Sequence, residues 1–334
     1  METNLHRKIR FAVIGTNFIT DWVIEGARQD ERFELTAVYS RTQEQADLFA
    51  AKHHIPHTFT SLDELARSPL IDAVYVASPN FLHASQSILM MQHGKHVLCE
   101  KPLASNVREA EEMFRTARRY GVVLMEAMKP TLTPNFLALR DNLPKIGKVR
   151  RYFSSYCQYS SRYDKFKEGI VANAFKPEMS NGALVDIGIY TIYPMVVLFG
   201  RPRTIRATGV LLSTGVDGQG CVTFGYDEMD AVVMYSKIAN SSLPTEIQGE
   251  DGNLVLDRIN IIGDVKLTYR NGGGENLTVP GCRHEYYYEV KEFIDLIASG
   301  KSESEVNSPA RSLLTQEILQ EIRRQLGVVY PADR

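Results

Sequence analysis

The chain has 334 residues, of which 44% are hydrophobic and 23% are charged, and its formal net charge is −2. This length allows two domains of ordinary size, each with its own core, and the composition is typical of a soluble globular protein. Because no basic excess exists to neutralise phosphates, DNA and RNA are not expected as partners. The polar start and the short apolar runs predict a cytoplasmic protein with no signal peptide and no membrane span.

The first part of the chain alternates strand-like and helix-like patterns. The strand-like segments are 9–15, 33–40, 56–61, 71–79, 95–102 and 122–128, and the helix-like segments are 19–29, 41–54, 61–68, 83–94 and 106–121. Ser61 and Asn106 are expected to cap two of these helices, and Gly121 is expected to end one. Alternation with short connections predicts a Rossmann-type, doubly wound parallel α/β sheet over residues 1–127.

The pattern changes after residue 128. A helix is expected at 135–142, and most segments from 148 to 269 are strand-like, with one apolar helix inserted at 183–199. Two more helices are expected at 285–298 and 309–326. We therefore predict a second, α+β domain over 128–334 with a large open, mainly antiparallel sheet, which binds substrate and mediates oligomerisation. The apolar stretches 221–226 and 231–238 predict an outer sheet face that pairs with other copies, giving a homodimer or homotetramer.

The turn after the first strand, "GTNFIT", has one of the three glycines of a dinucleotide fingerprint. Gly15 holds the first place, while Asn17 and Thr20 hold the other two. Asn tolerates left-handed conformations and its amide can donate to a phosphate, whereas Thr20 would push the helix outward. This stretch alone fits both a cofactor turn and an ordinary strand–helix corner.

The end of the second strand carries no acid for a ribose 2′-hydroxyl. Ser40 and Arg41 stand there instead, a pair that suits a 2′-phosphate and predicts preference for NADP over NAD. The other interpretation is a helix N-cap, Ser40 or Thr42, beside a solvated arginine.

Three further residues are candidates for catalysis. Pro102 ends the fifth strand just after Lys101, where ligands of open α/β sheets bind. Asp186 and Tyr190 are four residues apart on the apolar helix and share one face. A satisfied internal Asp and a core Tyr are the alternative interpretation of that pair.

Three motifs in order resemble the oxidoreductase family named after glucose–fructose oxidoreductase, inositol dehydrogenase and the rhizopine-catabolism protein (Gfo/Idh/MocA). They are "ASPNFLH" (77–83), "EKP" (100–102) and "DIGIY" (186–190). The stretches "VLCEKP", "LMEA" and "LVDIGIYTIYPMVVLFG" are most similar to the branch of dimeric dihydrodiol dehydrogenases and NADP-dependent D-xylose dehydrogenases. That branch tends to carry an arginine after "MEA", where this chain has only Lys129.

The resemblance implies an NADP-dependent enzyme, with NAD as a possible cofactor, that moves a hydride between the nicotinamide and a carbinol carbon of a sugar, polyol or cyclic diol. It implies Lys101, Asp186 and Tyr190 as catalytic residues, with Tyr190 as the base, and a cis bond before Pro102. The implied cofactor-binding residues are Gly15, Thr16, Asn17, Phe18, Ile19, Ser40, Arg41, Ser78, Pro79, Asn80, His83, Glu100 and Lys101. His83 is open between a substrate contact and a helix cap.

Two other activities stay open within the wider family: an NAD-dependent glycosidase, and a cofactor-sensing regulator without catalysis. Retention of Lys101, Asp186 and Tyr190 disfavours the regulator.

Two other motifs are not expected to bind a metal or a phosphate. The "KHHIPH" histidines match ordinary linker sequence, so no metal site is expected, and "NGGGEN" (271–276) is expected to be a hairpin turn. Cys99, Cys157, Cys221 and Cys282 are widely spaced and are expected to be buried free thiols in a reducing compartment.

Overall fold

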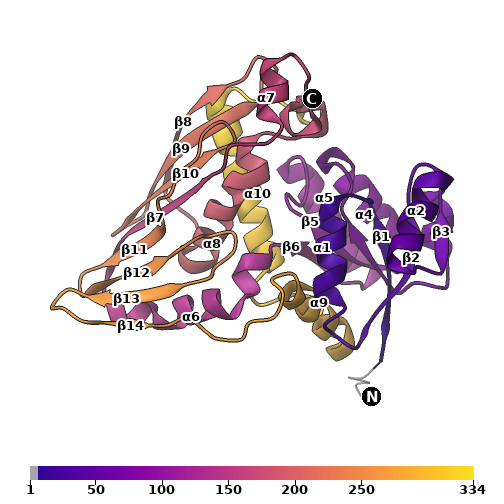
Figure 1. Cartoon of the computed structure of the whole chain (residues 1–334), viewed down its shortest axis with the longest axis horizontal. Helices are drawn as coiled ribbons and strands as arrows, with labels where there is room; N and C mark the ends of the chain where they lie inside the picture. Colours follow the sequence, from indigo (N-terminus) through magenta and orange to yellow (C-terminus); the bar gives the residue numbers. More distant parts are fainter. Residues whose placement is uncertain (1–6) are drawn as a thin grey trace. The chain divides into compact units, whose positions relative to one another are not determined.

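The computed structural model describes residues 7–334, and the polar start at 1–6 lies outside them. The described chain divides into two compact units, shown in Figure 1. The first contains residues up to 129 together with 283–310, and the second contains 130–282 together with 311–334. The sequence-derived boundary at 127/128 falls close to the first division. Residues 283–310, which it assigned to the second domain, lie in the first unit.

The first unit is a parallel α/β sheet. Its strands are β1 (Ile9–Ile14), β2 (Phe33–Tyr39), β3 (His57–Phe59), β4 (Ala73–Val76), β5 (His96–Glu100) and β6 (Leu124–Ala127), and its helices are α1 (Phe18–Ala27), α2 (Gln43–His53), α3 (Leu62–Arg67), α4 (His83–Gln92), α5 (Val107–Tyr120) and α9 (Tyr287–Ser299). The strand order is β3-β2-β1-β4-β5-β6, and every neighbouring pair is parallel. The order reverses between β1 and β4, so their carboxyl ends flank the position where such sheets bind ligands.

Local signals placed the helices of this unit correctly. The side chain of Ser61 accepts a hydrogen bond from the backbone N–H of Glu64 (3.3 Å), and that of Asn106 accepts one from Glu109 (3.0 Å). Gly121 ends α5 in the left-handed conformation, with φ of 66°. All four residues of β4 are buried, as expected for a strand covered on both faces. The predicted Rossmann-type sheet is confirmed.

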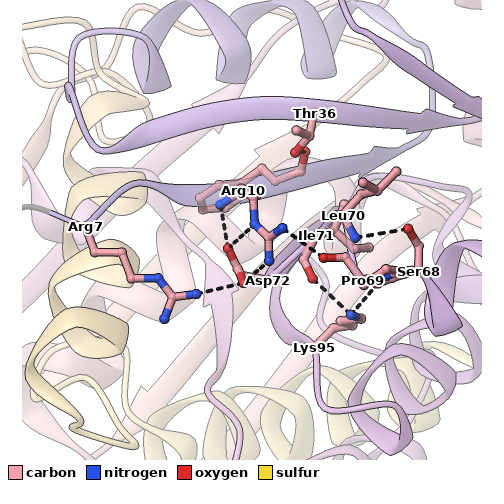
Figure 2. A network of polar contacts seen from close by, with 10 residues as sticks. Arg7, Arg10, Thr36, Ser68, Pro69, Leu70, Ile71, Asp72 and Lys95 are labelled. Carbon is pink, nitrogen blue, oxygen red and sulfur yellow. Dashed lines mark hydrogen bonds and ion pairs between the residues drawn. The ribbon is translucent and has the colours of Figure 1, made fainter.

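The amino-terminal edge of this sheet is held by a separate polar network, shown in Figure 2. Arg10 donates through Nε and Nη2 to the two carboxylate oxygens of Asp72 (2.9 and 2.8 Å) and through its backbone N–H (3.0 Å), and Arg7 adds a contact at 3.0 Å. Lys95 donates to the carbonyls of Ser68 and Ile71 (2.6 and 2.9 Å). Arg10 lies near the start of β1, while Asp72 and Lys95 precede β4 and β5. The network therefore holds the amino ends of β1, β4 and β5 together. The candidate ligand positions lie at the opposite, carboxyl ends of the strands.

Segment 283–310 joins the first unit through long-range contacts. Helix α9 packs against α1 and β5. Arg32 forms ion pairs with Asp30 (2.6 Å) and with Asp295 on α9 (2.8 Å). Asn307 donates to the carbonyl of Met128, which follows β6 (3.1 Å). The contacts of α9, Asp295 and Asn307 join residues that are remote in sequence, which explains why the linear pattern misplaced the segment.

The second unit is built on a mixed sheet. Its strands are β7 (Val149–Cys157), β8 (Thr204–Leu211), β9 (Asp217–Gly225), β10 (Asp230–Ser236), β11 (Thr245–Gly249), β12 (Gly252–Leu256), β13 (Val265–Tyr269) and β14 (Gly274–Asn276), and its helices are α6 (Pro134–Asn142), α7 (Tyr163–Lys167), α8 (Ile189–Phe199) and, from Arg311 on, α10 (Pro309–Leu326). The order is β14-β13-β12-β11-β7-β10-β9-β8. Only β7 and β10 pair in parallel, so the predicted large, mainly antiparallel sheet is confirmed.

Helices α6, α8 and α10 lie on one side of this sheet (Figure 1). The stretch Pro177–Phe199 is long and apolar enough to cross a membrane, but 83% of its apolar window is buried inside the structure, as in the core helix of a globular unit. Residues 271–273 form the turn between the antiparallel strands β13 and β14, so the hairpin prediction for "NGGGEN" is confirmed. All four cysteines are free thiols. Cys99 is buried, Cys157 and Cys221 are half-buried and Cys282 is exposed, so the expectation of burial is confirmed for Cys99 and was wrong for the other three.

Candidate functional site

The turn between β1 and α1 requires a glycine at its first place. Gly15 has φ of +110°, and a Cβ there would lie 2.4 Å from the carbonyl oxygen of Ala77, after β4. The Oγ1 of Thr20 donates to the carbonyl of Gly15 (3.0 Å), so this threonine closes the turn instead of pushing the helix away. The backbone is thus tightly bent without the second and third fingerprint glycines.

The side chain of Asn17 forms two hydrogen bonds in the same turn. Its Oδ1 accepts from the backbone N–H of Ile19 (2.9 Å) and caps α1, while its Nδ2 donates to the carbonyl of Ala77 (3.0 Å). One of the two hydrogens of the amide that was expected to donate to a phosphate is therefore bonded to the protein. Thr16, Phe18 and Ile19 complete the turn at the start of α1, where backbone N–H groups and the helix dipole favour an anion.

At the end of β2, the helix cap is Thr42. Its Oγ1 accepts from the backbone N–H of Gln45 (3.3 Å). Ser40 donates its backbone N–H to the carbonyl of Phe59 (3.1 Å). Arg41 is exposed, and within residues 7–334 it forms no ion pair. Of the two capping candidates, Thr42 holds that role, which leaves Ser40 and Arg41 as surface groups beside β2.

His83 connects the segment after β4 to the segment after β5. The side chain is 1% exposed, Nδ1 lies 2.9 Å from the carbonyl oxygen of Pro102, and Nε2 lies 2.8 Å from that of Ser78. Burial lowers the pKa of His83 and outweighs the two carbonyls, which favour the charged form. His83 was expected among the cofactor contacts. Both ring nitrogens instead face protein carbonyls, so His83 shapes the loops that carry Pro79, Asn80 and Lys101.

The peptide bond between Lys101 and Pro102 is cis, as the family resemblance implied. Before it, Glu100 ends β5 with a buried carboxyl group. Its Oε1 accepts a 2.5 Å hydrogen bond from the hydroxyl of Tyr75, and its Oε2 accepts from the backbone N–H of Lys101 (3.3 Å). Burial raises the pKa of Glu100, although the charge of Lys101 opposes this. Glu100 therefore fixes the backbone of Lys101 from inside the unit.

A second buried acid near this group escaped the sequence reasoning. Glu289 on α9 is 0% exposed, and among the described residues neither carboxyl oxygen has a hydrogen-bond partner. Burial, followed by the charge of Glu100, raises the pKa of Glu289 well above its ordinary value. An uncharged carboxylic acid is the form that this site favours. The only signal in the sequence was an acid inside the otherwise apolar stretch "YYYEV".

Lys129 is the basic residue in the stretch after "LMEA", where the resemblance implies an arginine. It is 5% exposed, forms an ion pair with Glu285, and lies 4.3 Å from the centre of the Tyr286 ring. All three residues belong to the first unit. Lys129 therefore attaches the segment before α9 to the end of β6.

In the second unit, Asp186 and Tyr190 lie at the start of the core helix. Asp186 belongs to a π-helical turn, Leu184–Gly188, that precedes α8, and Tyr190 is in the first turn of α8. The turn packs on β10, where a Cβ at Gly188 would lie 2.9 Å from the ring of Tyr235. The ring of Tyr190 meets that of Tyr156 edge-on at 5.8 Å. The regular helix predicted for 183–199 thus begins with a wider turn.

Asp186 forms an ion pair with Lys237, a residue that the sequence reasoning missed. The ammonium group is nearly buried, with 7% exposure of the side chain, against 31% for Asp186. Nearby, Oδ2 of Asp217 accepts from the backbone N–H of Leu184 (2.6 Å), at the start of the π-helical turn. Asp217 at the start of β9 and Lys237 directly after β10 therefore hold the segment that carries Asp186.

Two of the "KHHIPH" histidines have structural roles at the end of α2. Nε2 of His53 lies 2.7 Å from Oδ1 of Asp21, and His54 ends α2 in the left-handed conformation. Within residues 7–334, no three His, Cys, Asp or Glu side chains are grouped so that they could hold a metal ion.

Two family models match the chain. The model of the oxidoreductase family with an NAD-binding Rossmann fold matches residues 9–128, and that of the GFO/IDH/MocA C-terminal domain matches residues 144–255. The chain is 56% identical over 326 residues to the scyllo-inositol 2-dehydrogenase (NADP(+)) IolU of Bacillus subtilis, covering 98% of this chain and 99% of that protein. It is 34% identical over 321 residues to the trans-1,2-dihydrobenzene-1,2-diol dehydrogenase of Danio rerio, covering 91% and 92%.

A solved structure of levoglucosan dehydrogenase, in complex with NADH and levoglucosan, has the same fold. The TM-score is 0.85 at 19% identity, with 96% of this chain and 98% of that chain covered. Together with the two matched domains and the retained motifs, these relatives place the chain plainly: it belongs to the Gfo/Idh/MocA family of oxidoreductases.

Proposed function

We propose that this protein is an NADP-dependent dehydrogenase that acts on a secondary alcohol of a cyclic polyol or sugar, with scyllo-inositol as the first substrate to test. The observation that carries the proposal is 56% identity, over 98% of the chain, to a relative named as an NADP(+)-dependent scyllo-inositol 2-dehydrogenase. The sequence retains Lys101, Asp186 and Tyr190, the three catalytic candidates of the family motifs.

The residues around the β1–α1 turn fit a dinucleotide. Only a glycine fits at position 15, because a Cβ would lie 2.4 Å from the carbonyl oxygen of Ala77, and this tight turn leads into the N-terminus of α1, which favours an anion. Arg41 is exposed at the end of β2, where a 2′-phosphate would meet its guanidinium instead of the acid that favours NAD. We propose Gly15, Thr16, Asn17, Phe18 and Ile19 for the pyrophosphate end.

For the other contacts, we propose Ser40 and Arg41 at the 2′-phosphate, and Ser78, Pro79, Asn80, Glu100 and Lys101 toward the nicotinamide end. His83 belongs to this set as a residue that shapes the loops rather than as a direct contact, because its ring nitrogens lie against the carbonyls of Pro102 and Ser78.

The bound nicotinamide would supply the hydride acceptor, and the protein would handle the proton and the charge. We assign to Tyr190 the removal of the substrate hydroxyl proton, and its return in the reverse direction. Lys101 would stabilise the negative charge that develops on the substrate oxygen. Asp186, held by Lys237, would orient the substrate hydroxyl.

The test is a panel of inositols, aldoses and cyclic diols incubated with NADP or NAD, with absorbance at 340 nm followed over time. Net NADPH formation with a cyclic polyol, faster than with NAD, supports the proposal. Sugar release from a glycoside without net reduction would indicate a glycosidase instead, and tight cofactor binding with no turnover on any member would indicate a sensor.

We also propose a cytoplasmic homo-oligomer, a dimer or tetramer formed through the outer face of the eight-stranded sheet. The four free cysteines suit a reducing compartment. On the outer face, half-buried apolar side chains lie opposite each other on neighbouring strands: Val232 with Phe153, and Met234 with Cys221. Light scattering would show a dimer or tetramer for the natural chain and a smaller species for Val232→Glu; a monomeric natural chain would refute the proposal.

A further inference from the structure

Lys237 occupies an unusual position for a lysine. It follows β10 directly and is 6% exposed. Its backbone is fixed on both sides, because its N–H donates to the carbonyl of Gly218 (2.9 Å) and its carbonyl accepts from Ser160 (2.9 Å). The side chain therefore starts from a rigid point at the end of the sheet and reaches the π-helical turn before α8.

Groups around the ammonium group of Lys237 stabilise its positive charge. Asp186 pairs with it directly, and the centre of the Phe175 ring lies 5.7 Å from Nζ. The positive charge of Lys237 also favours the ionised form of Asp217, the residue that accepts from Leu184 at the start of the same turn. A buried ammonium needs a partner of opposite charge, and the more exposed of its partners is Asp186.

We propose that Lys237 is a positioning residue of the catalytic machinery, which holds the carboxylate of Asp186 in one orientation toward the substrate. This rests on the function proposed above. The ion pair joins the sheet to the turn that carries Asp186 and leads into Tyr190. Nothing in the family motifs includes position 237, and Lys237 is assigned no direct contact with substrate.

A purely structural lysine would behave differently from a positioning residue. Its loss would lower stability whether or not Asp186 could ionise. A residue that acts through Asp186 loses its influence once that carboxylate is gone, so the two substitutions must be strongly non-additive in turnover. The conservative Lys237→Arg should retain much of the activity, because it keeps the charge.

The experiment is a double-mutant cycle of Lys237→Met and Asp186→Asn, with Lys266→Met as the control at an exposed strand lysine (62% exposed side chain). We expect each single variant to lower kcat by about 10- to 100-fold, and the double variant to lose no more than about 3-fold beyond Asp186→Asn. The affinity for NADP should stay within about 2-fold of the natural protein, because the proposed cofactor residues lie in the other unit. Lys266→Met should behave as the natural protein does.

The proposal would be overturned if the losses in kcat of the two single variants multiply in the double variant. It would also be overturned if Lys237→Met has the same kcat as the natural protein. If Lys237→Met does not fold, Lys237→Arg decides: retained kcat supports the proposal, and loss equal to that of Asp186→Asn overturns it. The same cycle measured by urea unfolding tests the ion pair without any substrate. If Lys237 and Asp186 are coupled in the free energy of unfolding, but the natural protein turns over no alcohol, the result would reject only the proposed function.

Discussion

The side-chain amide of Asn17 donates a 3.0 Å hydrogen bond to the carbonyl oxygen of Ala77. The same oxygen would lie 2.4 Å from a Cβ at Gly15. The carbonyl of Ala77, after β4, therefore has two effects on the turn. It leaves room only for a glycine at position 15, and it accepts a hydrogen bond from Asn17, which replaces the second glycine of the fingerprint. The side chain of Asn17 thus links the turn between β1 and α1 to the segment that follows the neighbouring strand β4.

Asn17→Ala removes both this hydrogen bond and the cap of α1. We expect the free energy of unfolding to fall by about 1–2 kcal/mol, and the affinity for NADP to fall as well, measured by urea unfolding and by calorimetric titration. Ser61→Ala is the matched control, because Ser61 caps α3 away from the candidate site. It should lower stability by a similar amount and leave cofactor affinity unchanged. Equal effects of the two variants on cofactor affinity would contradict this account of Asn17.

Arg41→Ala tests the assignment of the 2′-phosphate. A charge-assisted hydrogen bond contributes about 1.5–3 kcal/mol, so we expect the Kd for NADP to rise roughly 10- to 100-fold while the Kd for NAD stays unchanged. Arg67→Ala is the control, since Arg67 is another exposed arginine of the same unit (69% exposed side chain). Tighter binding of NAD than NADP by the natural protein would overturn the assignment, as would an equal loss of both affinities in Arg41→Ala.

His96 should make the protein sensitive to acid. Burial lowers its pKa to about 4, against about 6.5 in an unfolded chain. Between these values the unfolded chain binds a proton that the folded protein does not, so stability falls as the pH drops from about 6.5 to 4. Full protonation of the unfolded chain corresponds to at most about 3 kcal/mol.

His96→Asn should reduce this loss of stability at acid pH, because Asn does not titrate in this range. The side-chain oxygen of the Asn can accept from the backbone N–H of Val123, which donates to Nδ1 of His96 in the natural protein (3.0 Å). Urea unfolding at a series of pH values measures the effect. His54→Asn is the control, because His54 is exposed and left-handed, a conformation that Asn tolerates. An acid profile that His96→Asn leaves unchanged would show that another group causes the loss.

Asp217 should act in the opposite direction. Burial raises its pKa to about 6, although the backbone N–H of Leu184 and the charges of Lys237 and Arg323 oppose the shift. Between pH 3.8 and 6 the folded protein keeps a proton that the unfolded chain releases, so this group costs stability as the pH rises, up to about 3 kcal/mol. Asp217→Asn keeps an acceptor for Leu184 and should gain stability over the natural protein at pH 7 but not at pH 4. A constant difference between the two proteins across this range would contradict the prediction.

The sequence predicted what short-range signals determine. Ser61, Asn106 and Gly121 mark helix ends by chemistry that acts within three or four residues, and the apolar runs of the first unit predict a parallel sheet. The family motifs identified Lys101, Asp186 and Tyr190 as candidates. What stayed hidden depends on partners remote in the chain: Lys237 with Asp186, Glu289 beside Glu100, and α9 against α1 and β5.

A motif also does not show which of its side chains are bonded within the protein. His83 ends "ASPNFLH" and was expected to contact the cofactor, yet its two ring nitrogens lie against the carbonyls of Ser78 and Pro102. The amide of Asn17 is bonded in the same way to Ala77. No pattern in the linear sequence gives such partners, because they arise only where two loops meet after neighbouring strands.

The most direct measurement is the single-turnover rate of NADPH formation from scyllo-inositol by the natural protein and by Lys101→Met, both verified as folded and loaded with NADP. The account predicts measurable reduction by the natural protein and a loss of at least ~10²-fold in the variant, since the developing alkoxide would lack its cation. A variant rate close to that of the natural protein would contradict the catalytic role of Lys101 and the mechanism that depends on it.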